Sequence, residues 1–119
     1  RGRVENISIE NMYASICPGT VDVKGNYCAL IHIMSGLDMK NMVFRNIVRE
    51  ENNCYLPTIK IYANNTIDSL VVDGIHQTIA DGNTVIPVES EADIKRLELK
   101  NIFGGECQFK GKIDKLITD

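Results

Sequence analysis

Four side chains with binding chemistry interrupt short apolar stretches: His32 in "LIHIM", Lys60 and Tyr62 in "TIKIY", and Glu89 in "IPVES". If alternate residues of these stretches are buried, the four side chains point outward on one surface. A lysine there can pair with the carboxylate of a sugar acid, and a tyrosine ring can stack on a sugar face. The same residue types also occur on ordinary solvated strand faces that bind no ligand, and this is the alternative interpretation of the four residues.

Two further polar residues, Gln108 and Lys110, extend this pattern near the end of the chain. No residue is assigned a catalytic role, because His32 and His76 lie on different segments and neither has a serine or cysteine in a recognisable nucleophile setting. The acidic stretches "REENN" and "ESEAD" contain the oxygen ligands that Ca²⁺ takes, but charged loops of this kind are common. We therefore assign no metal site and expect no cofactor.

The elements that would position these residues repeat along the chain. Each copy has an apolar residue followed by apolar residues three, five and eight places later. The copies begin at Val4, Met39, Ile67, Ile94 and, in part, Ile113. The intervals between copies vary, which indicates loops of different length joined to a constant structural unit.

A second repeat precedes the first by eight residues. It consists of the apolar pairs Ile31 and Ile33, Ile59 and Ile61, and Ile86 and Val88. Both repeats alternate apolar and polar residues and are rich in β-branched side chains, which predicts strands with one buried face. No segment has ten residues of amphipathic 3.6 period, so helix is at most a minor component.

An Asn or Gly interrupts each long apolar segment at an equivalent position: Asn11, Asn46, Gly74 and Asn101. Asn and Gly are the residues that most readily accept a positive φ, so a bend is expected there. If equivalent positions stack, the Asn side chains can hydrogen-bond to one another.

The repeats favour an all-β fold, a parallel β-helix of about four coils in which residues 1–119 form one domain. A leucine-rich repeat array is the alternative, but its Asn falls one place later and its repeat is shorter. In a β-helix each coil covers its neighbour, so both ends expose a strand edge that extra coils, a partner chain or a covering segment must seal. The chain starts at Arg1 with its repeats running by Val4, and we expect it to be part of a longer protein.

The composition narrows the range of partners. The 16 acidic and 13 basic residues give a net charge of −3 without a basic run, so we expect neither nucleic acid nor a membrane as partner. No apolar run approaches the roughly 20 residues that cross a bilayer. The four cysteines form no CxxC pair, which argues against a zinc ribbon. Cys28 and Cys107 lie in apolar segments, which favours free thiols over disulfides.

The order of the two repeats resembles the right-handed β-helices of the pectin-lyase-like superfamily, and most closely the polygalacturonase-type, family 28-like glycoside hydrolases. In that family a groove strand "I-x-I-x-S-G" precedes "xNIxIxN", and "ALIHIMSGLDMKNMVFRN" from Ala29 to Asn46 matches this order. Thr58-Ile59-Lys60 takes the place of the family's "RIK" segment. The resemblance implies a right-handed coil with a substrate groove along the short strands.

The catalytic motifs of that family are missing. The positions of its adjacent aspartates hold Cys28 and Ala29, "NNTID" has the letters of "NTD" in another frame, and "GIH" at Gly74 lacks the "GHG" setting. Glycoside hydrolysis needs two carboxyl groups facing one bond, about 5 to 10 Å apart. Fold resemblance therefore extends further than functional resemblance.

Two functional hypotheses remain open. The first is a secreted or cell-surface segment of a glycoside hydrolase or polysaccharide lyase, directed to polysaccharides or oligosaccharides, whose catalytic residues lie outside this chain or are absent. The second is a non-enzymatic structural, adhesion or spike module whose exposed coil edges mediate self-association or glycan binding. The fold resemblance favours the first hypothesis, and the missing carboxylates favour the second.

Overall fold

The computed structural model describes residues 1–16, 30–51, 56–79 and 85–118, without the side chains of residues 16, 51 and 79. These residues form strands, turns and irregular segments, and there is no helix among them. The predicted all-β class is therefore confirmed. In the described part of the chain, accordingly, no helix could cross a membrane.

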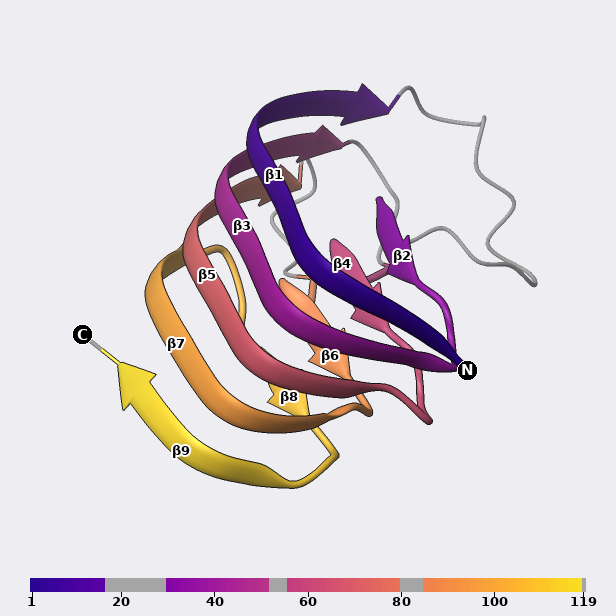
Figure 1. Ribbon diagram of the computed structural model, residues 1–119. Helices are drawn as coiled ribbons and strands as arrows, with labels where there is room; N and C mark the ends of the chain where they lie inside the picture. The colour runs from indigo at the N-terminus through magenta and orange to yellow at the C-terminus, as the bar shows by residue number, and fades with distance from the viewer. Residues whose placement is uncertain (17–29, 52–55, 80–84, 119) are drawn as a thin grey trace.

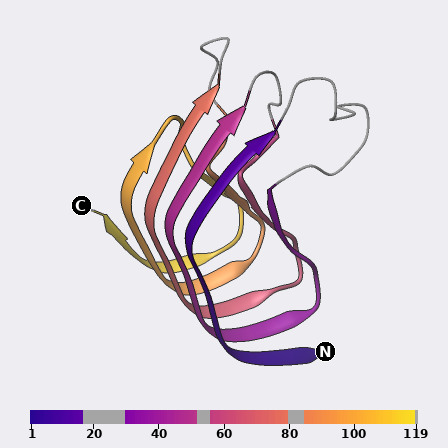
Figure 2. The ribbon, with the colours of Figure 1, turned by 90° about the horizontal axis from the view of Figure 1, so that it is seen from above.

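The strands form two parallel sheets, and the chain passes from one to the other throughout (Figures 1 and 2). The sheet of long strands has the order β1 (Gly2–Ile16), β3 (Leu37–Glu51), β5 (Thr66–Ile79), β7 (Asp93–Phe103) and β9 (Ile113–Thr118). The sheet of short strands has the order β2 (Ile31–Ile33), β4 (Ile59–Ile61), β6 (Val88–Ser90) and β8 (Gln108–Phe109). A short strand and the long strand that follows it form one repeat unit, and each unit lies beside the next.

The apolar template sets the register of the long-strand sheet. Ile7, Met42, Leu70 and Leu97 are direct partners in successive strands, as the repeat predicted. Met42, Leu70 and Leu97 are buried between the two sheets because each has a neighbour on both sides. The copies beginning at Val4, Met39, Ile67, Ile94 and Ile113 align in the same way.

The long strands bend at the predicted Asn and Gly positions. The φ angles are 58° at Asn11, 56° at Asn46, 55° at Asn101 and 95° at Gly74. Asn46 Nδ2 donates to Asn11 Oδ1 at 2.9 Å, so these two side chains form the expected stack. Gly74 has no side chain to continue it, and Asn101 Nδ2 instead donates to Asp73 Oδ1 at 2.9 Å. The long strands continue past the bend, because the parallel ladder of β1, β3 and β5 has paired residues on both sides of it.

The structure corrects the alignment of the third short strand by two residues. Ile59 pairs with Val88 and Ile61 with Ser90, so Ile86 precedes the strand and is not the partner of Ile59. The cause is the length of the connection to the next long strand. Only Glu91 and Ala92 lie between β6 and β7, whereas residues 62–65 lie between β4 and β5.

The two acidic stretches are also largely strand and not loop. Arg49 and Glu50 belong to β3, and Arg49 is fully buried. In the second stretch, Glu89 and Ser90 belong to β6 and Asp93 begins β7. Asn52 and Asn53 of the first stretch lie outside the described residues, and so do Cys28 and Ala29.

Candidate functional site

The short-strand sheet brings the predicted binding residues into one row. His32 pairs in register with Lys60, Lys60 with Glu89, and Glu89 with Gln108. His32, Lys60 and Glu89 each lie at the central, outward position of a short strand, because the residues on either side of them are buried. Gln108 continues the row on β8. We call this row, together with Tyr62, Glu91 and Lys110, the short-strand face.

Lys60 is held by two carboxylates. Its Nζ lies 2.7 Å from Glu89 Oε2 and 3.6 Å from Glu91 Oε2. The Lys60 and Glu89 side chains are only 16% and 17% exposed, so water screens this pair less than an ordinary surface ion pair. Lys110 Nζ contacts the other Glu89 oxygen at 3.3 Å. Glu89 is therefore bridged by two ammonium groups, and the four formal charges cancel.

The environment keeps Lys60 and Glu89 ionised. The hydrogen bond from Lys60 lowers the pKa of Glu89 below its usual range, and Lys110 adds to this effect, although burial opposes it. Burial acts to lower the pKa of Lys60, but the hydrogen bond and charge of Glu89, with those of Glu91, raise it above its ordinary value. Both groups are thus charged at neutral pH.

An aromatic pair adjoins these charges. The rings of His32 and Tyr62 stack with centroids 5.9 Å apart and an interplanar angle of 10°. Tyr62 Oη lies 3.2 Å from His32 Nδ1, within hydrogen-bond distance. Lys60 Nζ is 5.4 Å from the centre of the Tyr62 ring, a favourable distance for a cation over an aromatic face. The ammonium and ring groups of the site therefore contact one another directly.

Glu91 is the member of the site that sequence reasoning missed. It follows β6 and its backbone N–H donates to Ile61 O at 2.9 Å, which continues the parallel pairing one residue past the strand. Lys110 N donates to Ser90 O at 2.8 Å in the same manner at the next strand. The alternation of buried Val88 and Ser90 with the outward Glu89 continues to Glu91 and could have identified it. The two-residue misalignment of this strand in the sequence repeat concealed that signal.

The arrangement supplies hydrogen-bond donors and acceptors, but its most deeply engaged carboxyl group, Glu89, is not suited to act as a general acid. Glu89 and Glu91 are two carboxyl groups around one ammonium nitrogen, which the sequence alone had not brought together. A glycosidase acid must hold its proton at working pH, which requires a raised pKa. The pKa of Glu89 is shifted in the opposite direction. In the described part of the chain, no group of three or more His, Cys, Asp or Glu side chains could hold a metal ion.

A buried polar cluster inside the fold was also not predicted. Arg49 Nη1 donates to Leu56 O at 2.7 Å and to Thr58 Oγ1 at 2.9 Å. Thr58 Oγ1 donates to Gln77 Oε1 at 2.6 Å, and Gln77 Nε2 donates to Val85 O at 2.5 Å. The cluster satisfies buried polar groups at the end of the long strands, so it serves the fold and not a surface site.

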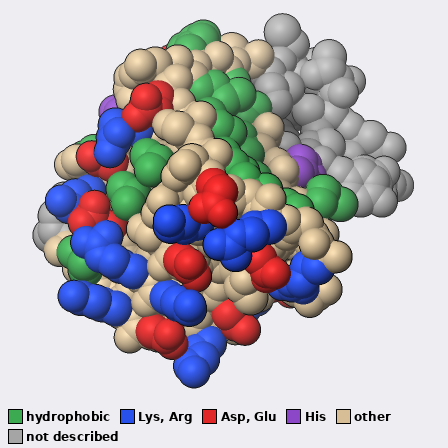
Figure 3. All heavy atoms as spheres, in the orientation of Figure 1, with side chains coloured by type: hydrophobic (Ala, Val, Ile, Leu, Met, Phe, Trp, Pro, Cys, Tyr) green, Lys and Arg blue, Asp and Glu red, His purple; other side chains and the backbone are tan. Residues whose placement is uncertain are grey.

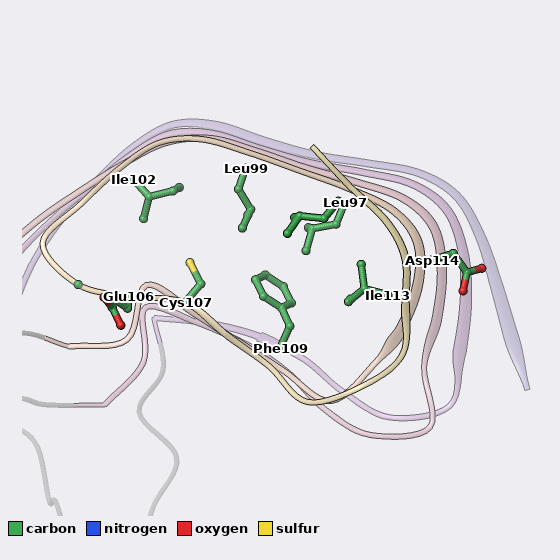
Figure 4. Close-up of a pocket in the computed structure, with 10 residues that line it drawn as sticks. Leu97, Leu99, Ile102, Glu106, Cys107, Phe109, Ile113 and Asp114 are labelled. Carbon is green, nitrogen blue, oxygen red and sulfur yellow. The ribbon is translucent and has the colours of Figure 1, made fainter. Parts of the chain in front are cut away.

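The last repeat unit lines an open apolar cavity of about 680 Å³ (Figure 4). Leu99, Ile102, Phe109 and Ile113 point into it, and so does Cys107, a free thiol whose pKa is raised by burial. The remaining cysteines, Cys17, Cys28 and Cys54, lie outside the described residues. The cavity is the uncovered end of the core, with β9 as the edge strand of its sheet.

Comparison with known proteins returned no matching protein-family model, curated protein or solved structure.

Proposed function

We propose that the two sheets are walls of a right-handed parallel β-helix similar to those of the pectin-lyase-like superfamily, and that the short-strand face binds a polysaccharide or oligosaccharide. The alternation of the chain between two in-register parallel sheets supports the first part of this proposal. The observation that supports the second is the row of His32, Lys60 and Glu89 beside Tyr62.

The ligand chemistry follows from the charges of this face. Lys60 is engaged by Glu89 and Glu91, so a uronate carboxylate would have to displace one of them. Sugar hydroxyls require no such exchange, because Glu89 can accept and Lys110 can donate hydrogen bonds to neighbouring hydroxyls. The aromatic pair adds a surface on which a sugar ring can pack. We therefore assign hydroxyl-rich, neutral or weakly acidic sugar chains as ligands.

The role of these repeat units is that of a groove wall. Since the ionised Glu89 is unsuited to donate a proton, hydrolysis by the parent protein would take its general acid from another residue. In this proposal the protein is an extracellular or cell-surface β-helix related to the polysaccharide-degrading enzymes.

Calorimetric titration with neutral and galacturonate oligosaccharides tests this proposal. Tyr62→Ala and Glu89→Gln should each weaken binding by about tenfold, since each removes one ring or charged contact worth roughly 1.4 kcal/mol. Lys95→Met, a change of an exposed lysine on the other sheet, is the control and should leave affinity unchanged. Absence of binding at millimolar glycan would remove the proposal. Release of shortened sugar products would show that the chain cleaves the glycan and does not only bind it.

A second function, as a structural or adhesion module, is favoured by the apolar cavity and the open edge of β9. Apolar surface and unpaired strand edges attract further strands. Light scattering tests whether the module associates with itself. A stable dimer or trimer supports self-assembly through the cavity and the edge of β9, whereas a monodisperse monomer contradicts self-assembly.

A further inference from the structure

Gly74 interrupts the ladder of asparagine side chains at the bends of the long strands. It lies on β5, the central strand of its sheet, between Asn46 on β3 and Asn101 on β7 at the equivalent positions. An asparagine at this place would donate to Asn46 Oδ1, as Asn46 Nδ2 donates to Asn11 Oδ1. The ladder therefore lacks one carboxamide group between two strands that retain theirs.

The missing carboxamide leaves hydrogen-bonding groups of its two neighbours without partners. Among the described residues, no group donates to Asn46 Oδ1. Asn101 Nδ2 donates one hydrogen to Asp73 Oδ1 at 2.9 Å, and its second hydrogen has no acceptor in the described part of the chain. Neighbouring strands are about 4.8 Å apart, so a group midway between Asn46 and Asn101 is one strand spacing from each. The gap thus presents an acceptor on one side and a donor on the other.

A pocket of about 170 Å³ occupies this gap. This volume exceeds the roughly 30 Å³ that one water takes in the liquid, so the pocket admits a group of several heavy atoms. Gly74 keeps it open, because a Cβ added there would lie 3.2 Å from Asn46 N. The lining residues are Asn46, Gly74, Ile75, His76, Asn101 and Phe103.

Two aromatic rings border the pocket, two residues after the bend. His76 and Phe103 are direct partners on β5 and β7, with ring centroids 5.7 Å apart and an interplanar angle of 43°. The same outward position carries Tyr13 on β1 and Val48 on β3. Before the bend, by contrast, many outward side chains are charged and paired, and Figure 3 shows acidic and basic side chains mixed on the face seen in Figure 1. The surface after the bend is therefore suited to a less charged ligand.

We propose that the pocket at Gly74 binds the acetamido group of an N-acetylated sugar whose ring packs against His76 and Phe103. The amide N–H of the ligand donates to Asn46 Oδ1, and its carbonyl accepts from Asn101 Nδ2. The ligand thereby completes the asparagine ladder. An acetamido group is attached directly to the sugar ring, so its place in the gap brings the ring to the aromatic pair, on which it can pack.

A sugar hydroxyl meets this pattern less well than an amide does. A hydroxyl oxygen with two hydrogen bonds of about 2.8 Å joins groups less than about 6 Å apart. Asn46 and Asn101 lie on strands two spacings apart, or about 9.6 Å. The N–H and C=O of a trans amide point in opposite directions and so reach toward both neighbours.

This site lies on the other sheet from the short-strand face, so the inference goes beyond the sugar site proposed above and does not depend on it. Triacetylchitotriose and cellotriose are a matched pair of probes, since one has an acetamido group where the other has a hydroxyl on each ring. Each would be titrated into the full chain, and the affinity would be read from the NMR signals of the Asn46 and Asn101 side-chain amides. This readout leaves binding at the short-strand face out of the measurement.

Triacetylchitotriose should bind about tenfold more tightly than cellotriose, because only the acetamido group makes both hydrogen bonds. Gly74→Asn supplies the missing carboxamide from the chain itself and should abolish this preference. Phe103→Ala, which leaves the backbone of the bend unchanged, should weaken the binding of triacetylchitotriose about fivefold. Tyr13→Ala removes a ring from the same outward position three strands away and is the control, which should leave the affinity unchanged.

Equal affinity of the two sugars at Asn46 and Asn101, or signals that do not shift at millimolar sugar, would overturn the inference. So would tighter binding of a capped asparagine peptide, which would assign the pocket to a protein side chain. If Gly74→Asn does not fold, equal losses for Phe103→Ala and Tyr13→Ala would be decisive against it. Tyr62→Ala should leave the affinity read at Asn46 and Asn101 unchanged, so failure of this pocket and failure of the short-strand face are distinguishable.

Discussion

Leu97 and Leu116 occupy the same position on adjacent long strands, yet Leu97 is 1% exposed and Leu116 is 57% exposed. The two residues have the same side chain, and they differ in that Leu97 has a strand on each side whereas Leu116 lies on the edge strand β9. Burial in this fold is therefore a property of stacking and not of the individual segment. A repeat unit alone covers little apolar surface, which explains why the template is written several times in one chain.

Stacking predicts unequal costs for equal truncations. Leu70→Ala removes a fully buried side chain between two neighbours and should lower the free energy of unfolding by about 2 to 5 kcal/mol. Leu116→Ala, the control, should cost less than about 1 kcal/mol because its side chain is largely exposed already. Urea denaturation measures both values. Similar losses for the two variants would contradict the stacking account.

The bends predict a penalty that depends on φ. Asn46→Ala forces an alanine to φ of 56° and should cost about 1 to 2 kcal/mol from backbone strain, in addition to the lost bond to Asn11. Asn46→Gly should lose only the bond. Asn41→Ala is the matched control, because Asn41 makes the same kind of bond to Asn6 at 3.0 Å without a positive φ. Thermal unfolding should rank Asn46→Ala as the least stable of the three, and any other ranking speaks against strain at the bend.

The Lys60–Glu89 pair predicts how stability depends on pH. The pKa of Glu89 in the folded state lies below its ordinary value of 4.5, so its contribution is present above about pH 4.5 and is lost as the pH falls through the folded-state pKa. The pKa of Lys60 lies above 10.5, so its contribution is present below that pH and is lost as the pH rises through the folded-state pKa.

Glu89→Gln should therefore reduce stability by about 1 to 2 kcal/mol at pH 7 and by less at an acidic pH below 4.5, where the carboxylate becomes protonated. Asp68→Asn, which breaks the exposed pair with Lys95, should change stability by less than about 0.5 kcal/mol at either pH. Denaturant titrations of the three proteins at both pH values provide the comparison. A loss for Glu89→Gln that is independent of pH would show that its charge is not the cause.

The buried polar cluster predicts a large effect from one hydroxyl group. Thr58→Val keeps the shape of the side chain but removes the oxygen that links Arg49 to Gln77, and it should cost about 2 to 3 kcal/mol. Thr78→Val on the exposed side of β5 is the control and should change stability by less than about 0.5 kcal/mol. Equal stability of the two variants would mean that the cluster contributes nothing to the fold.

Periodic features of this fold were readable from the sequence because they depend on local chemistry. The template starting at Val4, Met39 and Ile67 gave the long-strand register, since a slip would expose the apolar set. The positive φ at Asn11, Asn46, Gly74 and Asn101 followed from residue type alone. His32, Lys60 and Glu89 were placed on outward positions by alternation.

Features that depend on loop length and long-range pairing were not readable. The short connection between β6 and β7 shifted Val88 and Ser90 by two residues relative to the sequence repeat. Burial of Arg49 was missed because its partners Leu56 and Thr58 lie beyond the end of β3. The contact between Lys60 and Glu91 was missed because the short connection between β6 and β7 had shifted the predicted alignment of β6. This contact changes the proposed ligand group from a uronate carboxylate to sugar hydroxyls.

The most direct test of the central claim is a set of methyl NOEs in protein labelled at Ile, Leu and Met. Stacked repeat units place Leu70 between Met42 and Leu97, with neighbouring strands about 4.8 Å apart. The account predicts strong NOEs from Leu70 to both residues, and none directly between Met42 and Leu97, which are two strands apart. A direct Met42–Leu97 contact, or absence of contact between Leu70 and either of them, would contradict it.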